Sequence, residues 1–224
     1  AIQELTQKID WRQRFAAYAK LTQDNLKSLT ALQNWKDHKN EPLPTYLKII
    51  AVASPLLFVA LVITYFVTSE LLYLQYLSYL FVFNQLIFGS QFKKISQSIQ
   101  HSDQIDEMMK QYSKILEVIE KEDFTSKKLQ SLREKLFINH SKSSAEIKKL
   151  SEIMSNLDTI GNLVIAVVFN GIGLYHLHIY NQLLKWKHSN QAYFEQWLEV
   201  ISQFEMLNSF ANLHYNNPDF CFPV

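Results

Sequence analysis

Long stretches without charged side chains are the clearest feature of this sequence. Residues 49–69 contain no Asp, Glu, Lys or Arg, and after Glu70 residues 71–92 are again uncharged. Each stretch has about twenty residues, which is the length that an α-helix needs to cross the hydrocarbon layer of a membrane. The polar segment between them is short enough for a tight turn. The pattern therefore predicts a helical hairpin over residues 45–92 that spans a membrane.

Basic residues flank this expected hairpin on both sides. Lys48 precedes the first stretch, and Lys93 and Lys94 follow the second. Because positive residues near membrane helices tend to stay in the cytoplasm, both termini are expected there and the turn outside. Another interpretation stays open, since a helix that is apolar all round also fits the core of a soluble α-domain.

A third uncharged stretch, residues 159–184, differs from the first two in its polar content. It contains Asn162, Asn170 and Asn181 together with glycines and histidines. Such polar groups are costly in lipid unless they have partners. This stretch is therefore interpreted as a core helix.

The remaining residues repeat apolar side chains at the spacing of amphipathic helices. Residues 1–44 are expected to form one or two such helices, which end before the prolines Pro42 and Pro44. Their apolar positions are Trp11, Phe15, Tyr18, Ala19, Leu26, Leu29, Leu32 and Trp35. Residues 93–224 are expected to form a third region, a domain of long helices.

Four apolar stripes define the helices expected in residues 93–224. They are Ile105, Met108, Met109, Tyr112, Ile115, Leu116 and Ile119; Phe124, Leu129, Leu132 and Leu136; Ile147, Leu150, Ile153 and Leu157; and Phe194, Trp197, Leu198, Ile201, Phe204, Leu207 and Ala211. Thr125 or Ser126 is the expected N-cap of the second helix, and Ser143 or Ser144 that of the third. The last helix is expected to stop at Asn216-Asn217-Pro218.

Composition agrees with an all-α fold and narrows the function. The 224 residues include only 4 Gly and 5 Pro, fewer than a turn-rich β-fold needs. A single Cys excludes an intramolecular disulfide framework, and a net charge of +1 gives no attraction of the whole chain to nucleic acid.

The search for reactive side chains predicts no catalytic, cofactor-binding or metal-binding residue. Gly171 and Gly173 are followed by no Lys-Ser or Lys-Thr pair, so they do not form a phosphate-binding loop. His176 and His178 are two positions apart and point in different directions on a helix, which favours packing hydrogen bonds over metal binding. Cys221 is interpreted as a small buried hydrophobic residue.

One basic segment, residues 121–149, could contact the phosphates of DNA by releasing counterions. The candidate residues are Lys127, Lys128, Arg133, Lys135, Lys142, Lys148 and Lys149. Acidic residues are interspersed among them, so an ordinary solvated face is the competing interpretation.

Motifs spread over the chain carry a family resemblance. They are Asp10-Trp11-Arg12, Arg14-Phe15 and Tyr18; Phe124, Ser126 and Leu129; Ala145, Ile147 and Leu150; Leu157-Asp158, Asn162, Asn170, Leu174, Leu177-His178 and Leu184-Lys185-Trp186-Lys187; and Trp197-Leu198, Phe204-Glu205, Leu207 and Ser209 to Pro218. With the apolar pair in residues 49–92, they resemble the membrane-associated MutS-related proteins of bacteria, in the core (lever) region. Such relatives commonly show an Arg after the Leu-Asp pair, whereas this chain has Thr159, Ile160 and Gly161.

The resemblance implies a non-catalytic helical lever module. The module would link an anchor in the bacterial cytoplasmic membrane to a C-terminal ATPase that lies beyond this fragment, in a protein of the DNA mismatch-repair type. ATP and Mg²⁺ are expected in that ATPase, as is any homodimer contact, while residues 49–92 would contact lipid and the lever DNA. The alternative is a membrane-anchored helical scaffold or sensor that uses neither DNA nor nucleotide.

Overall fold

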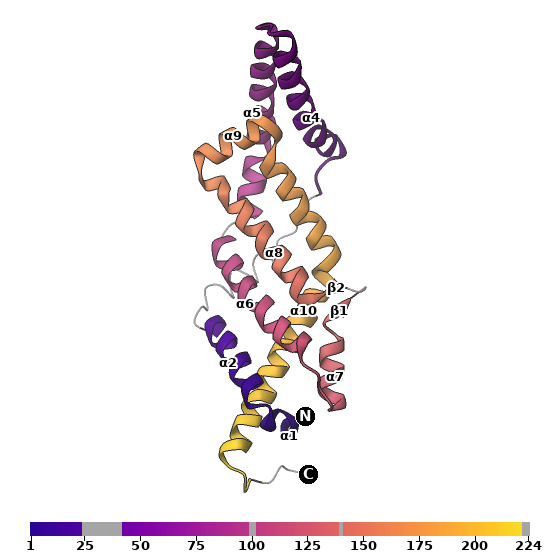
Figure 1. Cartoon of the computed structure of the whole chain (residues 1–224), viewed down its shortest axis with the longest axis vertical. Coiled ribbons are helices and arrows are strands. Elements are labelled where there is room, and N and C mark those ends of the chain that lie inside the picture. The colour runs from indigo at the N-terminus through magenta and orange to yellow at the C-terminus, as the bar shows by residue number, and fades with distance from the viewer. Residues whose placement is uncertain (24–41, 99–101, 139–140, 221–224) are drawn as a thin grey trace. The chain divides into compact units, whose positions relative to one another are not determined.

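The computed structural model describes residues 1–23, 42–98, 102–138 and 141–220 (Figure 1). These residues are helical apart from a short antiparallel ladder, so the all-α prediction is confirmed. In that ladder β1 (Phe137–Ile138) pairs with β2 (Ser141–Lys142). The predicted positions Leu26, Leu29, Leu32, Trp35 and Cys221 lie outside the described residues.

The helices follow one another along the chain with short connections. They are α1 (Ile2–Gln7), α2 (Ile9–Gln23), α4 (Thr45–Thr68), α5 (Leu72–Ser98), α6 (Ser102–Lys121), α7 (Lys127–Glu134), α8 (Ser143–Asp158), the 3-10 turn η1 (Thr159–Gly161), α9 (Leu163–Gly173) and α10 (Tyr175–Asn216).

The chain forms two compact units, each built from segments far apart in the sequence. Unit 1 comprises Ala1–Thr30, Asp106–Ser151 and Ser189–Val224. Unit 2 comprises Ala31–Ile105 and Glu152–His188.

An aromatic cluster lies in the core of unit 1. Trp11 and Phe15 of α2 contact Phe204 of α10, and Trp11 and Phe204 also contact Phe124, with ring centroids 5.3 to 6.4 Å apart. The indole Nε1 of Trp11 also donates a hydrogen bond to the Val118 carbonyl at 3.1 Å. The rings of the cluster are buried, as expected for the apolar stripes predicted around them.

Carboxylates from other helices cap α7 and α8. The residues at the helix starts were predicted correctly, with Ser126 the N-cap of α7 and Ser143 the first residue of α8. However, Ser126 makes no side-chain cap bond. Glu4 accepts hydrogen bonds from the backbone N–H groups of Thr125 and Ser126, at 2.8 and 2.7 Å.

In unit 2, α4 and α5 form the predicted helical hairpin and pack against each other and against α9. Ser69 closes α4 with a left-handed backbone, φ 57°, and donates its N–H to the Tyr65 carbonyl at 2.8 Å. Gly171 and Gly173 allow the close approach of α9. A Cβ on Gly171 would lie 2.0 Å from the Phe81 ring of α5, and one on Gly173 would lie 3.2 Å from Pro55 of α4.

The prediction of one core helix over residues 159–184 is wrong. This stretch is divided into η1, α9 and the start of α10. Asn162 caps α9 by accepting hydrogen bonds from two backbone N–H groups, and Leu174 breaks the helix again with φ 53°. These two breaks turn α9 away from its neighbours, at 106° to the helical segment before it, and much of its side-chain surface is exposed.

Candidate functional site

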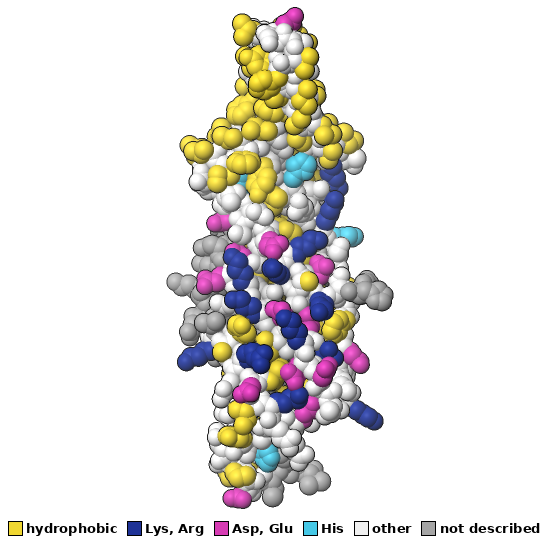
Figure 2. All heavy atoms as spheres, in the orientation of Figure 1, with side chains coloured by type: hydrophobic (Ala, Val, Ile, Leu, Met, Phe, Trp, Pro, Cys, Tyr) yellow, Lys and Arg dark blue, Asp and Glu magenta, His cyan; other side chains and the backbone are white. Residues whose placement is uncertain are grey.

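An extensive set of exposed hydrophobic side chains covers α4, α5 and α9 in unit 2 (Figure 2). Phe66, Leu163 and Val164 are 76%, 77% and 70% exposed. We call this set the apolar surface; it comprises Ile49, Val52, Leu56, Leu57, Val59, Ile63, Phe66 and Val67 of α4, Leu72, Leu74, Tyr76, Tyr79, Val82, Phe83, Leu86 and Phe92 of α5, and Leu163, Val164, Val167, Val168, Phe169 and Ile172 of α9. Contiguous exposed apolar patches of this kind mark a surface that meets a membrane or a partner.

By length and composition, α4 is the one described helix that could cross a membrane by itself. Only 11% of its apolar stretch is buried inside the structure. A second candidate combines two pieces, Ser143–Gly161 and Leu163–Gly173, which meet at an angle of 106°. α5 was expected to be the second crossing helix but does not meet this criterion.

Polar side chains of the hairpin point inward and bind one another. Ser54 Oγ of α4 donates to Asn84 Oδ1 of α5 at 2.7 Å, and Asn84 Nδ2 donates to the Gly171 carbonyl of α9 at 2.8 Å. Asn84 is fully buried. These bonds join the three helices that carry the apolar surface.

Two further bonds satisfy backbone carbonyls of the same helices. Gln85 Nε2 of α5 donates to the Val167 carbonyl of α9 at 2.5 Å. His178 Nε2 of α10 lies 2.6 Å from the Ala51 carbonyl of α4 and donates its proton to it. Internal pairing of this kind is what polar groups require where no water can reach them.

His176 is held neutral by a network at the break between α9 and α10. Asn170 Nδ2 lies 2.7 Å from His176 Nδ1, so Nδ1 accepts and the proton of the ring is on Nε2. His176 Nε2 then donates to Thr159 Oγ1 at 3.1 Å, while this hydroxyl donates to the Asn156 carbonyl at 2.6 Å. The prediction that His176 and His178 make packing hydrogen bonds is thus confirmed.

The candidate nucleic-acid residues lie on several elements of unit 1. Lys127, Lys128, Lys135, Lys142, Lys148 and Lys149 are exposed. Arg133 is half-buried, and its Nε donates to the Glu120 carbonyl at 3.0 Å, which gives it a structural role. On the face shown in Figure 2, basic and acidic side chains are intermingled.

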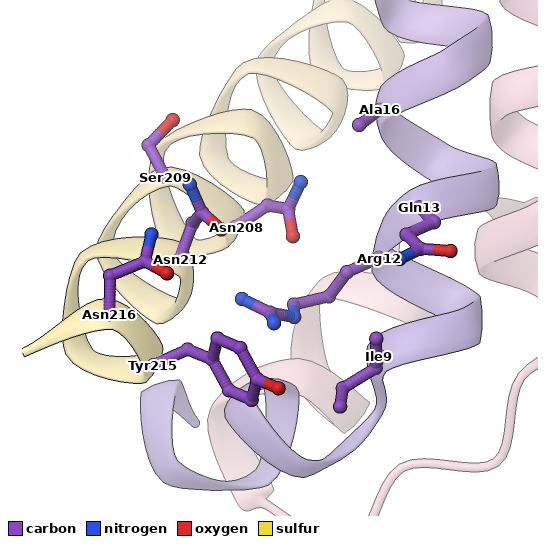
Figure 3. A pocket seen from close by; sticks show the side chains of 9 residues that line it. All are labelled: Ile9, Arg12, Gln13, Ala16, Asn208, Ser209, Asn212, Tyr215 and Asn216. Atoms are coloured by element: carbon purple, nitrogen blue, oxygen red, sulfur yellow. The ribbon is translucent and has the colours of Figure 1, made fainter. Parts of the chain in front are cut away.

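A cavity of about 430 Å³, which the sequence did not predict, lies between α2 and the end of α10, both in unit 1 (Figure 3). The Arg12 guanidinium points into it, with the Tyr215 ring on one side and Asn208 and Asn212 on the other (Figure 3). Arg12 is only 6% exposed. The available signal was its position beside Trp11 in a stripe of buried residues, where a charged side chain needs a partner.

Comparison with protein-family models, curated proteins and solved structures finds no match to this chain.

The chain's own chemistry must therefore indicate the function. Among the described residues, no group of three or more His, Cys, Asp or Glu side chains could hold a metal ion. The features that can interact with something outside the chain are the apolar surface, the exposed lysines and the Arg12 cavity. The first suits a lipid environment, the second polyanions, and the third a small anion.

Proposed function

We propose that this chain is a non-catalytic, membrane-anchored helical module, in which α4, α5 and α9 contact lipid. In this proposal it serves as the lever of a bacterial membrane-associated MutS-related ATPase and couples that ATPase to DNA or to another partner. The observation that carries the proposal is the apolar surface, combined with the internal pairing of the polar groups beneath it.

A soluble domain would hide such a surface. Burying apolar side chains stabilises a fold by about 25 cal/mol per Å² removed from water, so leaving this many exposed is unfavourable in water. Lipid removes that penalty. It also makes every unpaired polar group expensive, which explains why Ser54, Asn84 and Gln85 all have partners inside unit 2.

The charges around the hairpin support an orientation with both ends in the cytoplasm. Lys48 lies at the start of α4 and Lys93 and Lys94 near the end of α5, and all three are exposed. The turn at the opposite end of the two helices carries Glu70. Lysines on the inner side and none at the turn fit the usual bias of membrane proteins.

The long helices suit a lever because packed helices shift between discrete arrangements and do not deform continuously. α8 and α10 each contribute residues to both compact units. A displacement of either helix is therefore passed along a continuous hydrogen-bonded rod of backbone.

The membrane anchor is tested by expressing the full chain in bacteria and washing the membranes with alkaline carbonate. The chain should stay in the membrane pellet. A variant with Leu56→Lys, Val59→Lys and Ile63→Lys should move largely to the wash, because each lysine costs roughly 2.5 to 3.5 kcal/mol at the centre of a membrane helix.

Three lysines at exposed positions of unit 1 provide the control: Ser131→Lys, Glu134→Lys and Ser202→Lys. This variant should remain in the pellet like the unchanged chain. Recovery of the unchanged chain in the soluble fraction would exclude the anchor.

DNA binding separates the lever from the scaffold alternative. The chain in detergent should bind duplex DNA with an affinity that falls as salt rises. The double variants Lys127→Glu/Lys128→Glu and Lys148→Glu/Lys149→Glu should each weaken binding, whereas Lys20→Glu/Lys114→Glu, at exposed positions of α2 and α6, should have less effect. Absence of salt-dependent binding would favour a scaffold or sensor.

A further inference from the structure

The Arg12 cavity contains a buried cation whose hydrogen bonds are incomplete. Arg12 Nε and Nη1 are inaccessible to solvent and have no hydrogen-bond partner, and the same holds for Asn208 Oδ1. The Tyr215 ring lies 5.2 Å from the guanidinium carbon and stabilises the charge from one side. It does not replace the missing hydrogen bonds, and an unpaired buried charge costs several kcal/mol.

The residues around the cavity leave the charge of Arg12 without a counterion. None of the described residues that line it is Asp or Glu. The lining offers uncharged hydrogen-bonding groups, from Gln13 on α2 and from Asn208, Asn212, Tyr215 and Asn216 on α10. The site therefore has one cation and several neutral donors around a space that a ligand can enter.

We propose that this cavity binds the phosphate group of a small phosphate ester. A guanidinium presents five N–H donors in a planar fork that matches phosphate oxygens. The amide groups of Gln13 and of the three asparagines add donors for the remaining oxygens. Asn208 Oδ1 needs a donor in return, which a hydroxyl group of the ester supplies.

The size of the cavity favours an ester over the bare ion. A water molecule occupies roughly 30 Å³ of liquid volume. The cavity of about 430 Å³ therefore has room for an organic part beside the phosphate. This inference concerns unit 1 alone and does not depend on the membrane anchor.

The experiment measures the thermal unfolding midpoint of the full chain in an uncharged detergent. The probes are glycerol 3-phosphate, inorganic phosphate and acetate, each compared with chloride at the same ionic strength. A ligand that binds only the folded chain raises the midpoint as its concentration increases. Glycerol 3-phosphate should raise it most, inorganic phosphate less, and acetate no more than chloride.

Variants on the same helix assign the effect to Arg12. Arg12→Gln should abolish the shift caused by glycerol 3-phosphate, whereas Arg14→Gln, at an exposed position of α2, should retain it. Asn212→Asp serves as the second variant because this exposed residue can change without loss of core packing. Its new carboxylate should occupy Arg12, raise the midpoint without ligand, and weaken ester binding at least tenfold.

Three results would overturn the proposal. The first is a midpoint that glycerol 3-phosphate does not move beyond the chloride value. The second is an equal shift with acetate, which would show that any oxyanion acts. The third is an unchanged shift in Arg12→Gln or in Asn212→Asp.

Discussion

Glu120 connects two segments of unit 1 through its buried carboxylate. Ser143 Oγ and the Ser144 N–H each donate to Oε1 at 2.8 Å, and Ser144 Oγ donates to Oε2 at 2.5 Å. A negative group at this position satisfies free N–H groups at the start of α8 and complements the helix dipole. The residue is 3% exposed, so water cannot take over these bonds.

Replacing Glu120 should therefore be costly. Glu120→Ala should lower the free energy of unfolding by about 2 to 3 kcal/mol, because buried donors of α8 lose a charged acceptor. Chemical denaturation of the purified chain measures this change. Glu134→Ala, at an exposed position of α7, should change stability by less than about 0.5 kcal/mol. Equal effects of the two substitutions would contradict the role of the Glu120 carboxylate.

Glu4 performs the same service for α7 in a more accessible place. Burial by itself would raise the pKa of its carboxyl, but the hydrogen bonds from the Thr125 and Ser126 N–H groups outweigh it, and the pKa is lowered. A lowered pKa in the folded state means that the carboxylate stabilises the fold above its unfolded pKa. That stabilisation is lost as the pH falls through the folded value.

The pH dependence of a Glu4→Gln variant tests this reasoning. At pH 7 the variant should be less stable than the unchanged chain by about 1 kcal/mol, the usual cost of a lost cap. The difference should shrink as the pH falls below ~4.3, the ordinary pKa of Glu, because the native carboxyl then becomes protonated too. Unfolding curves at several pH values measure it, and a difference independent of pH would refute the assignment.

Among elements, α9 depends most on small residues, since Gly171 meets the Phe81 ring of α5 without space for a Cβ. Gly89 of α5 is the natural control, because nothing lies within 4 Å of where its Cβ would be. Both glycines lie inside helices. They differ in what surrounds them.

The matched variants Gly171→Ala and Gly89→Ala should therefore behave oppositely. Gly171→Ala should destabilise the chain by about 1 to 3 kcal/mol through overpacking. Gly89→Ala should stabilise it by up to about 1 kcal/mol, because Ala favours helix over Gly. Thermal unfolding in detergent compares them, and destabilisation by both would show that the approach of α9 is not the cause.

Element prediction from the sequence succeeded where one strong period controls the structure. The stripes of α6 and α8 put their apolar side chains into the core at the spacing of a helix. It failed at residues 159–184 because no period of hydrophobicity marks a break in a stretch that is apolar throughout. Asn162 was the local signal for a new N-terminus, whereas the left-handed backbone of Leu174 has no signal in its own residue type.

At the scale of the whole molecule, the question is which surface lipid touches. The single Cys221 can be replaced by Ser, so that one new Cys carries an environment-sensitive fluorophore. Reconstituted in vesicles, a label at Val164→Cys of α9 should be blue-shifted and strongly quenched by brominated lipid. A label at Glu134→Cys of α7 should be quenched little. Equal quenching at both sites would remove α9 from the proposed lipid contact.

The sequence by itself determined the helical class, the hairpin, and most helix limits. These follow from local rules: the length of uncharged stretches, the spacing of apolar residues, and the stop signal before Pro218. None of them needs information about residues that are distant along the chain.

Only the tertiary structure decided how distant residues satisfy one another. It made Glu4 and Glu120 the acceptors at two helix starts, brought Asn84 to the Gly171 carbonyl, and placed Arg12 in a cavity formed with the end of α10. Hydrogen bonds and unpaired charges depend on positions in space within a few ångström. The order of residues fixes which groups exist, and folding fixes which of them meet.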